Sequence, residues 1–303
     1  MSVSERLTQV YNTSCELSFN NYSKIILMID SHRGDGSRAD DFIPNKQVFL
    51  TALKKYYYLG YTYIELGDSD ELWQFKKFQQ IIEANQEVFR WLYKFHLQKR
   101  YYPIWGNHDI YKKEPKFWKE LRAYEKKFPL LYQIKAYEGI ILRHFETRQK
   151  LFLIHGHQAD PFNDRTWRIS CFLARYLWRP MEIYFGINDP ISPAKNHRRK
   201  NKIENRLIEW IKANHQILIA GHTHRPVFAS SNEPPYFNCG SSLHPDGITG
   251  IEIAAGSIAL VNWSNNLNRG NLNTYRKVIA GPEPLLSFFQ GPYASPSPIS
   301  NTC

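Results

Sequence analysis

Five short apolar runs, each ending at polar residues, constrain the fold of this chain more than any other feature. In chain order they read KIILMID, YTYIELGD, RYYPIWGNHD, KLFLIHGH and QILIAGHTH. Each run is rich in isoleucine, leucine or aromatic residues and is followed by glycine or other turn-forming residues, which is typical of buried strands. Strands that are apolar on both faces predict a sheet that helices cover on both sides.

Helical patterns separate these predicted strands. Residues 71–99 carry apolar side chains at close to 3.6-residue spacing, and residues 114–128 form a second candidate helix. Alternation of strands and helices predicts an α/β architecture. After residue 224, short segments separated by glycine, proline and asparagine predict a second, more antiparallel sheet that packs on the first.

Residues 158–214 interrupt the series of strands and predict a helical cap insertion within a domain that spans residues 1–280. We expect helix on either side of Pro180, and a loose tail over residues 281–303. Aromatic and basic side chains together suit a membrane headgroup interface. We favour the alternative, a lid that packs on the core and offers arginines to a phosphate. The side chains concerned are Trp167, Phe172, Leu173, Tyr176, Leu177, Trp178, Tyr184, Arg165, Arg168, Arg175 and Arg179.

Potential metal ligands stand at the ends of all five predicted strands, where ligands bind in α/β sheets. They comprise two carboxylates, one amide and four imidazoles: Asp30, His32, Asp68, Asn107, His155, His222 and His224. Oxygen and imidazole donors without cysteine suit manganese, iron or zinc. Seven donors are too many for one tetrahedral ion, so they predict two divalent cations that share a bridging carboxylate and a bridging water.

Each motif has an ordinary reading when it stands alone. A single Asp-x-His or His-x-His is more often a capping or surface pair, and a single GNHD is more often a turn. Five such motifs in one chain, each at the end of a predicted strand, are not plausibly independent accidents. The conjunction therefore predicts a metal centre.

The motifs DSH at 30–32, GDSDE at 67–71, GNHD at 106–109, HGH at 155–157 and GHTH at 221–224 resemble those of the calcineurin-like metallophosphoesterase superfamily. The resemblance covers roughly residues 24–265 outside the insertion. It implies a four-layer αββα sandwich of two mixed sheets flanked by helices. It also implies a phosphatase or related hydrolase, in which a hydroxide that bridges two metal ions attacks phosphorus in line.

The resemblance assigns a role to each matching position. Asp30, His32 and His224 would hold one ion, Asp68 would bridge, and Asn107, His155 and His222 would complete the second ion. The catalytic pair would be His108, which protonates the leaving oxygen or stabilises the phosphoryl charge, and Glu71, which orients His108. Asn238, Gly240 and Ser241 would form a turn that closes near the site.

Two further residues are tentative substrate-binding candidates. Arg33 follows the first motif and could bind substrate phosphate through its fork of donors, or could pair with Asp35 in a loop. His157 lies two residues past His155 and either lines the site or packs in a loop, and we favour the site. We expect His96, His144, His197, His215 and His244 to be structural, loop or surface residues.

Substrate class is less constrained. The HGHQAD element, the GHTHRP ending and the insertion resemble the branch that contains UDP-diacylglucosamine pyrophosphohydrolases, which implies a lipid-linked substrate and peripheral contact with a membrane. Our first expectation is a small phosphorylated or pyrophosphate-containing metabolite, of which a lipid-linked substrate is one form. The formal charge of +11 also suits a phosphoprotein phosphatase or a nucleic-acid phosphodiesterase, although no nucleic-acid-binding motif is present. A non-catalytic binding module is the remaining alternative, but it predicts missing ligands, and none is missing.

Composition bounds the cellular context. None of the four cysteines forms a CxxC pair, so we expect a reducing, cytoplasmic environment. The N-terminal residues lack the apolar region of a signal peptide, and no stretch of about 18 apolar residues predicts a transmembrane helix.

Overall fold

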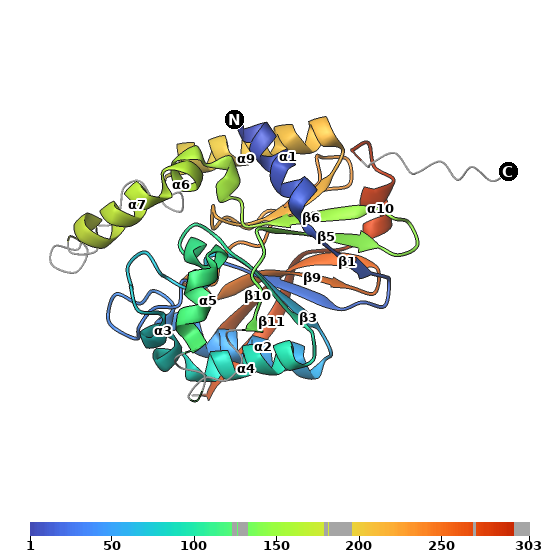
Figure 1. Ribbon diagram of the computed structural model, residues 1–303. Coiled ribbons are helices and arrows are strands. Elements are labelled where there is room, and N and C mark those ends of the chain that lie inside the picture. The colour runs from blue at the N-terminus through green and yellow to red at the C-terminus, as the bar shows by residue number, and fades with distance from the viewer. Residues whose placement is uncertain (123–125, 127–132, 179–180, 182–195, 269–270, 294–303) are drawn as a thin grey trace.

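The structure, a computed structural model, describes residues 1–122, 126, 133–178, 181, 196–268 and 271–293. These residues form two packed β-sheets with helices on both outer faces (Figure 1). This arrangement confirms the predicted α/β fold of two mixed sheets flanked by helices.

Sheet I contains six strands and carries the first three motifs. Its order is β11 (Asn271–Pro284), β10 (Ser257–Asn268), β9 (Ile248–Ala254), β2 (Ile25–Met28), β3 (Thr62–Leu66) and β4 (Tyr101–Ile104). β2, β3 and β4 run parallel, whereas β9, β10 and β11 pair antiparallel to their neighbours. All four residues of β2 are buried, as expected for a strand that is covered on both faces.

Sheet II contains five strands and carries the last two motifs. Its order is β1 (Cys15–Phe19), β5 (Gly139–His144), β6 (Lys150–Ile154), β7 (Ile217–Ala220) and β8 (Tyr236–Asn238). Only β5 and β6 pair antiparallel, because a short hairpin joins them.

The division of strands between the sheets differs from the prediction. The segments after residue 224 do not form a separate sheet, since β8 joins sheet II and β9 pairs with β2 in sheet I. The five motif strands are consequently split between the two sheets. Apolar runs indicate where strands lie, but which strands pair depends on contacts between distant segments.

Helices cover the outer face of each sheet. α2 (Lys46–Tyr58), α3 (Phe78–Ala84), α4 (Gln86–Leu97) and α5 (Pro115–Leu121) lie on the side of sheet I, whereas α1 (Val3–Thr13) and α9 (His197–Asn214) lie on sheet II (Figure 1). Short 3-10 turns occur at η1 (Ile43–Asn45), η2 (Ile110–Lys113) and η5 (His157–Ala159). The predicted helix over 71–99 is two helices, α3 and α4, preceded by a loop.

An apolar layer between the sheets joins them. It contains Leu27 and Ile64 from sheet I and Leu153 and Ile219 from sheet II. α10 (Leu285–Phe289) adds Leu285, Phe288 and Phe289 to the same layer. The ordered domain therefore continues past residue 280, where the sequence analysis placed the start of a tail; residues 294–303 lie outside the described part of the chain.

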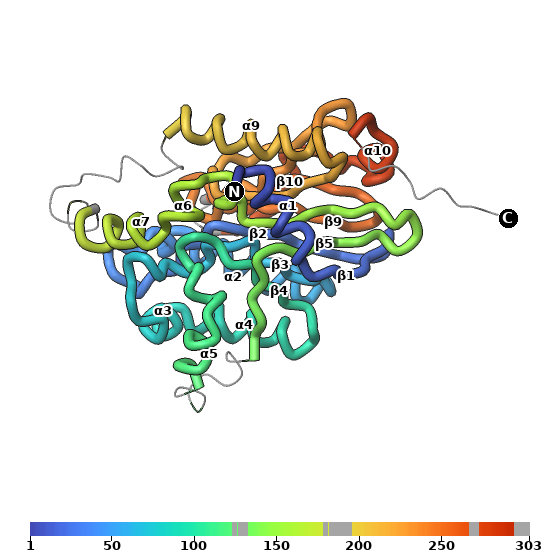
Figure 2. The backbone as a smooth tube through the Cα atoms, turned by 45° about the horizontal axis from the view of Figure 1, so that its top comes forward, coloured from blue at the N-terminus to red at the C-terminus, as the bar shows by residue number. Residues whose placement is uncertain are grey.

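The insertion leaves the body of the molecule as α6 (Pro161–Arg165), α7 (Trp167–Leu173) and the π-helix η6 (Ala174–Trp178), which extend to one side in both views (Figures 1 and 2). α9 belongs instead to the domain core, because Leu207, Trp210 and Ile211 pack against sheet II. The projecting insertion is thus shorter than residues 158–214. Arg179, Pro180 and Tyr184 lie outside the described residues.

No helix in the described ranges is long and apolar enough to cross a membrane.

Candidate metal centre

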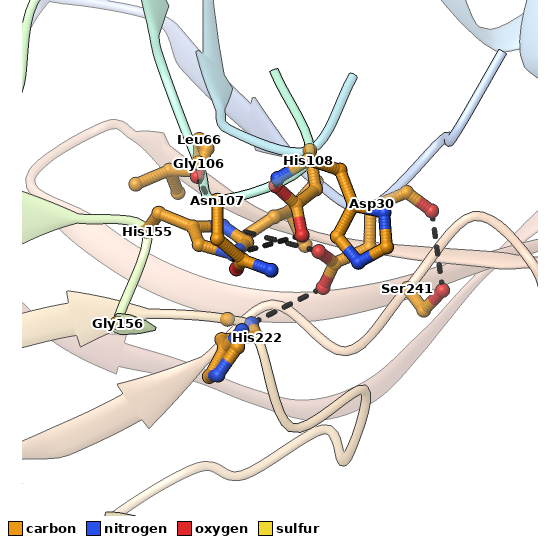
Figure 3. A network of polar contacts seen from close by, with 12 residues as sticks. Asp30, Leu66, Gly106, Asn107, His108, His155, Gly156, His222 and Ser241 are labelled. Atoms are coloured by element: carbon orange, nitrogen blue, oxygen red, sulfur yellow. Dashed lines mark hydrogen bonds and ion pairs between the residues drawn. The ribbon is translucent and has the colours of Figure 1, made fainter. Parts of the chain in front are cut away.

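All the predicted metal ligands lie where the carboxyl ends of motif strands from the two sheets meet. Asp30, Asp68 and Asn107 follow β2, β3 and β4 of sheet I, and His155 and His222 follow β6 and β7 of sheet II. Figure 3 shows side chains from both sheets pointing toward one another across this junction. Parallel strands place their carboxyl ends at one edge of a sheet, which explains why residues so far apart in sequence converge.

The backbone at these positions is strained. Among the described residues, nine that are not glycine adopt a positive φ. Five of the nine are predicted ligands: Asp30 (49°), His32 (44°), Asp68 (46°), His222 (65°) and His224 (55°). L-residues enter this region at a cost of about 1–3 kcal/mol each, and such strain persists where the surroundings enforce it, often at functional sites.

Two glycines allow the loops to approach each other. A Cβ atom on Gly106 would lie 2.2 Å from Oδ1 of Asp68. A Cβ atom on Gly67, which has a φ of 99°, would lie 2.8 Å from the ring of His155. A larger residue at Gly106 would displace Asp68, and one at Gly67 would push His155 of sheet II away from the sheet I ligands.

The first ligand group consists of Asp30, His32 and His224, whose donor atoms lie within 4.8 Å of one another. Nε2 of His32 is 3.9 Å from Oδ1 of Asp30, and Nε2 of His224 is 3.7 Å from Oδ2 of Asp30. Nδ1 of His32 donates to Glu71 at 2.9 Å, which leaves Nε2 as the nitrogen available to a cation.

The second ligand group consists of Asp68, His155 and His222, with Asn107 beside it. Nε2 of His155 lies 3.1 Å from Oδ2 of Asp68 and 3.2 Å from Oδ1 of Asn107. Nδ1 of His155 contacts the carbonyl of Leu66 at 3.1 Å, so Nδ1 carries the proton in the neutral ring. Three lone pairs therefore point at one place, which suits a cation.

Asp68 lies between the two groups. Its Oδ2 is 3.1 Å from His155 of the second group and 3.8 Å from Nε2 of His32 in the first. Burial works to raise the pKa of Asp68, but the His155 imidazole beside it lowers that pKa well below 3.8. Asp68 is thus the carboxylate that keeps its charge in the centre of the site.

Orphaned polar atoms fit a metal site. Oδ1 of Asp30 and Nε2 of His32 are buried and make no hydrogen bond within the described part of the chain. Burial raises the pKa of the Asp30 carboxyl to about 7, although the His155 imidazole opposes this. Buried oxygen and nitrogen atoms without partners are costly in free energy unless a cation binds them. The residues present therefore fit divalent metal ions.

His108 stands beside the ligands and is held on three sides. Its Nδ1 lies 2.7 Å from Oε2 of Glu71, and its ring stacks on Trp73 with centroids 4.1 Å apart. The ring of His32 meets it edge-on at 4.5 Å. Burial works to raise the pKa of Glu71, but His108 and His32 lower it to about 2, so Glu71 stays charged.

The predicted turn after β8 connects the two sheets near the ligands. The Asn238 amide donates to the carbonyl of Gly221 at 3.0 Å, and its oxygen accepts from the backbone of Gly240 at 2.9 Å. The Ser241 hydroxyl donates to the carbonyl of Asp30 at 3.3 Å (Figure 3). These contacts support the backbone that carries the ligands.

Arg33 lies behind the site and does not face it, which corrects its predicted substrate role. Its side chain is 0% exposed. Its Nε donates to Asp70 at 2.8 Å and its Nη1 to Glu65 at 2.7 Å, and it does not pair with Asp35. Backbone pairing of Arg33 with the loop after β3 draws the side chain inward, and sequence position alone does not indicate that pairing.

His157 also lies behind the ligands. It is fully buried, 5.5 Å from the ring of Trp105 and 5.4 Å from the ring of His155 between centroids. Burial lowers the pKa of His157 well below 6.5, so the ring is neutral. This burial favours the packing alternative, since a side chain without exposed surface offers nothing to a substrate.

Asp160 is a site residue that the sequence analysis missed. Its Oδ2 lies 3.2 Å from Nε2 of His222, and Arg199 of α9 donates to both its oxygens at 2.9 and 2.8 Å. Burial lowers the pKa of His222, so the ring stays neutral, donates from Nε2 and keeps Nδ1 for a cation. The only signal was the acidic residue that ends HGHQAD.

The chain matches the family model of the calcineurin-like phosphoesterases over residues 53–226, which is more than half of its length. The protein therefore belongs to the calcineurin-like phosphoesterase family. Five of the seven predicted ligands, from Asp68 to His224, lie within the match. Asp30 and His32 precede it, and the structure brings them beside His224 in the same site.

Solved structures with a similar fold include Vacuolar Protein Sorting 29 from Cryptosporidium parvum, which is 15% identical with a TM-score of 0.38 and covers 86% of this chain and 98% of that one. A single mutant of Vps29 from Entamoeba histolytica is 15% identical, with a TM-score of 0.35 and coverage of 85% and 99%. Wild-type Vps29 with Zn+2 from the same organism is 17% identical, with a TM-score of 0.35 and coverage of 84% and 98%. These likenesses concern the fold alone. Among curated proteins, none matches the chain significantly.

Replacing Arg33 by methionine should destabilise the protein by about 3–5 kcal/mol, because it removes the buried guanidinium that Glu65 and Asp70 share and leaves only Lys112 to pair with Asp70. Urea unfolding measures the loss. The KM of the folded fraction should stay unchanged, and a raised KM at normal stability would restore the substrate role of Arg33.

The same ion pairs predict the acid sensitivity of the fold. Burial works to raise the pKa values of both carboxyls, but Arg33 lowers that of Glu65 below 4.5 and that of Asp70 below 3.8. The ion pairs therefore stabilise the fold at pH values above the ordinary pKa of these carboxyls. This contribution is lost as the pH falls through their lowered pKa values. Unfolding measured between neutral and acid pH should show the loss in the wild type and a smaller one in Arg33→Met.

Asp160→Asn should weaken divalent-metal affinity by about 10- to 100-fold, because the His222 ring loses the carboxylate that orients it. Calorimetric titration with Mn²⁺ measures this. Asp246→Asn is the matched control, since Asp246 is exposed and lies outside the clusters that could hold a metal ion in the described part of the chain. Equal affinities of Asp160→Asn and the wild type would remove Asp160 from the site.

Proposed function

We propose that the protein is a hydrolase of phosphate esters or phosphoanhydrides that uses two divalent cations, of which manganese, iron and zinc are the candidates. The observation that carries the proposal is the convergence of seven donor side chains at one junction, with charged Asp68 between two groups of ligands. Membership of the calcineurin-like phosphoesterase family supports the same chemistry. When bound, the cations would activate water and neutralise phosphate charge.

His108 is the residue that would act on the leaving group. Glu71 occupies its Nδ1 and Trp73 fixes the plane of its ring, so Nε2 is the nitrogen left for substrate. From there it would donate a proton to the leaving oxygen or stabilise charge on the phosphoryl group. The ring is partly exposed, unlike most of the ligands, which suits a group that must meet substrate.

Catalysis distinguishes this proposal from the non-catalytic alternative. Asp68→Asn should abolish activity and lower metal content, because it removes the anionic ligand between the two groups. His108→Ala should keep its metal and lose about 10²- to 10⁴-fold in kcat. Exposed Asp246 supplies the control Asp246→Asn.

Mn²⁺-loaded enzyme is assayed with chromogenic phosphomonoesters and phosphodiesters, and metal content is measured by elemental analysis. The preference between the two esters separates a phosphatase from a phosphodiesterase. Full activity of Asp68→Asn would refute the proposal, and metal loss in His108→Ala would mean that His108 has a different role.

A lipid-linked substrate is the second candidate, and the surface of the insertion favours it. Large apolar side chains of α7 and η6 are exposed: Ile169 by 57%, Phe172 by 60%, Tyr176 by 53% and Leu177 by 42%. Arginines in the same segment suit an anionic headgroup layer. The protein would then be a peripheral protein at the cytoplasmic face of a membrane, with a substrate akin to a UDP-diacylglucosamine.

Binding to vesicles tests this candidate. The wild type should sediment with vesicles that contain phosphatidylglycerol and much less with phosphatidylcholine alone. Phe172→Ser should reduce sedimentation, because it removes buried apolar area at the interface. Tyr58→Ser, which removes an exposed aromatic residue at the end of α2, is the matched control. Equal binding of all three proteins would exclude the insertion as the contact surface.

A further inference from the structure

Residues 71–76 form a loop next to His108, and the insertion is attached to this loop at three points. Nε of Arg175 donates to the carbonyl of Trp73 at 2.7 Å, and its Nη2 donates to the carbonyl of Leu72 at 2.9 Å. Nζ of Lys76 donates to the Tyr176 hydroxyl at 2.7 Å. Neighbouring residues of η6 thus hold both ends of the loop.

The opposite side of the same loop holds His108. Oε1 of Glu71 accepts from the backbone nitrogens of Trp73 and Gln74 at 3.2 and 3.1 Å, while Oε2 contacts Nδ1 of His108. The Trp73 indole stacks on the His108 ring at an interplanar angle of 23°. The carbonyl of Trp73 therefore accepts a hydrogen bond from the insertion. On its other side, the backbone nitrogen of Trp73 donates to Glu71 and its indole ring stacks on His108.

Packing reinforces this connection. Trp73 belongs to a buried apolar cluster with Trp105, Trp167, Cys171 and Ala174, of which the last three come from the insertion. The cluster brings α7 and η6 against the loop, and the guanidinium of Arg175 then supplies two directional bonds to its backbone. A planar fork of donors holds two adjacent carbonyls in a fixed geometry, whereas a lysine would approach both from a single nitrogen.

We propose that Arg175 is a positioning residue, which fixes the 71–74 turn so that Glu71 and Trp73 hold the His108 ring for action on substrate. The inference rests on the proposed catalytic function of His108. It gives the insertion a part in catalysis that is independent of any lipid contact. Arg175 acts through the loop and touches neither the predicted ligands nor the reacting atoms.

Arg175→Ala should lower kcat on the order of 10- to 100-fold, because small displacements of a catalytic group have large effects on rate. KM for a small chromogenic ester and metal content should stay near the wild-type values. Arg175→Lys should be intermediate. Arg100→Ala is the matched control. Arg100 donates to the carbonyls of Tyr57 and Tyr61 at the opposite end of β4, so this variant loses similar arginine–carbonyl hydrogen bonds far from the site.

A spectroscopic readout separates positioning from a general loss of stability. Stacking on Trp73 should shield the ring protons of His108, whose NMR signals are assigned by their absence from His108→Ala. Arg175→Ala should move these signals toward the values of a free histidine, and Arg100→Ala should leave them in place. Unchanged signals in Arg175→Ala would overturn the inference.

A double-mutant cycle completes the test with full-length, Mn²⁺-loaded protein. If Arg175 acts through His108, Arg175→Ala should cause little further loss of kcat in the His108→Ala background. Fully additive losses would overturn this inference and leave the proposed function intact. No loss in His108→Ala alone would overturn both the role of His108 and the role of Arg175.

Discussion

The hydrogen bond from the backbone nitrogen of His222 to Oδ2 of Asp30, 3.2 Å long, joins the two sheets at the point on which the rest of the site depends. Asp30 follows a strand of sheet I and His222 follows a strand of sheet II, so this bond links the two ligand sets directly (Figure 3). The apolar layer between the sheets supplies most of the stability of their packing. The polar junction at its edge determines which side chains meet.

The junction concentrates unfavourable features that only a cation relieves together. Five ligand positions adopt left-handed backbone conformations, and buried lone pairs of Asp68, Asn107 and His155 point at one another. A chain selected for stability alone would not keep such an arrangement. Behind it, the buried ion pairs of Arg33 and the carboxylate of Asp160 hold the loops and rings in place. These contacts orient the loops and rings independently of a bound ion, which favours correct geometry on binding.

The sequence predicted the local part of this structure and missed the part that depends on tertiary contacts. Glycine and a polar residue at the end of an apolar strand are visible in the sequence, so the ligand positions could be identified. Nothing in the sequence shows that β9 pairs with β2, that α9 is a core helix, or that Arg33 turns inward toward Glu65. Asp160 was missed because its function depends on the ring of His222, which is 62 residues away.

Anomalous diffraction from crystals soaked in Mn²⁺ tests the central claim most directly. The account predicts two peaks, one among Asp30, His32 and His224 and one among Asn107, His155 and His222, with the Asp68 carboxylate between them. No peak at the junction of the sheets, or manganese bound only elsewhere on the protein, would contradict it.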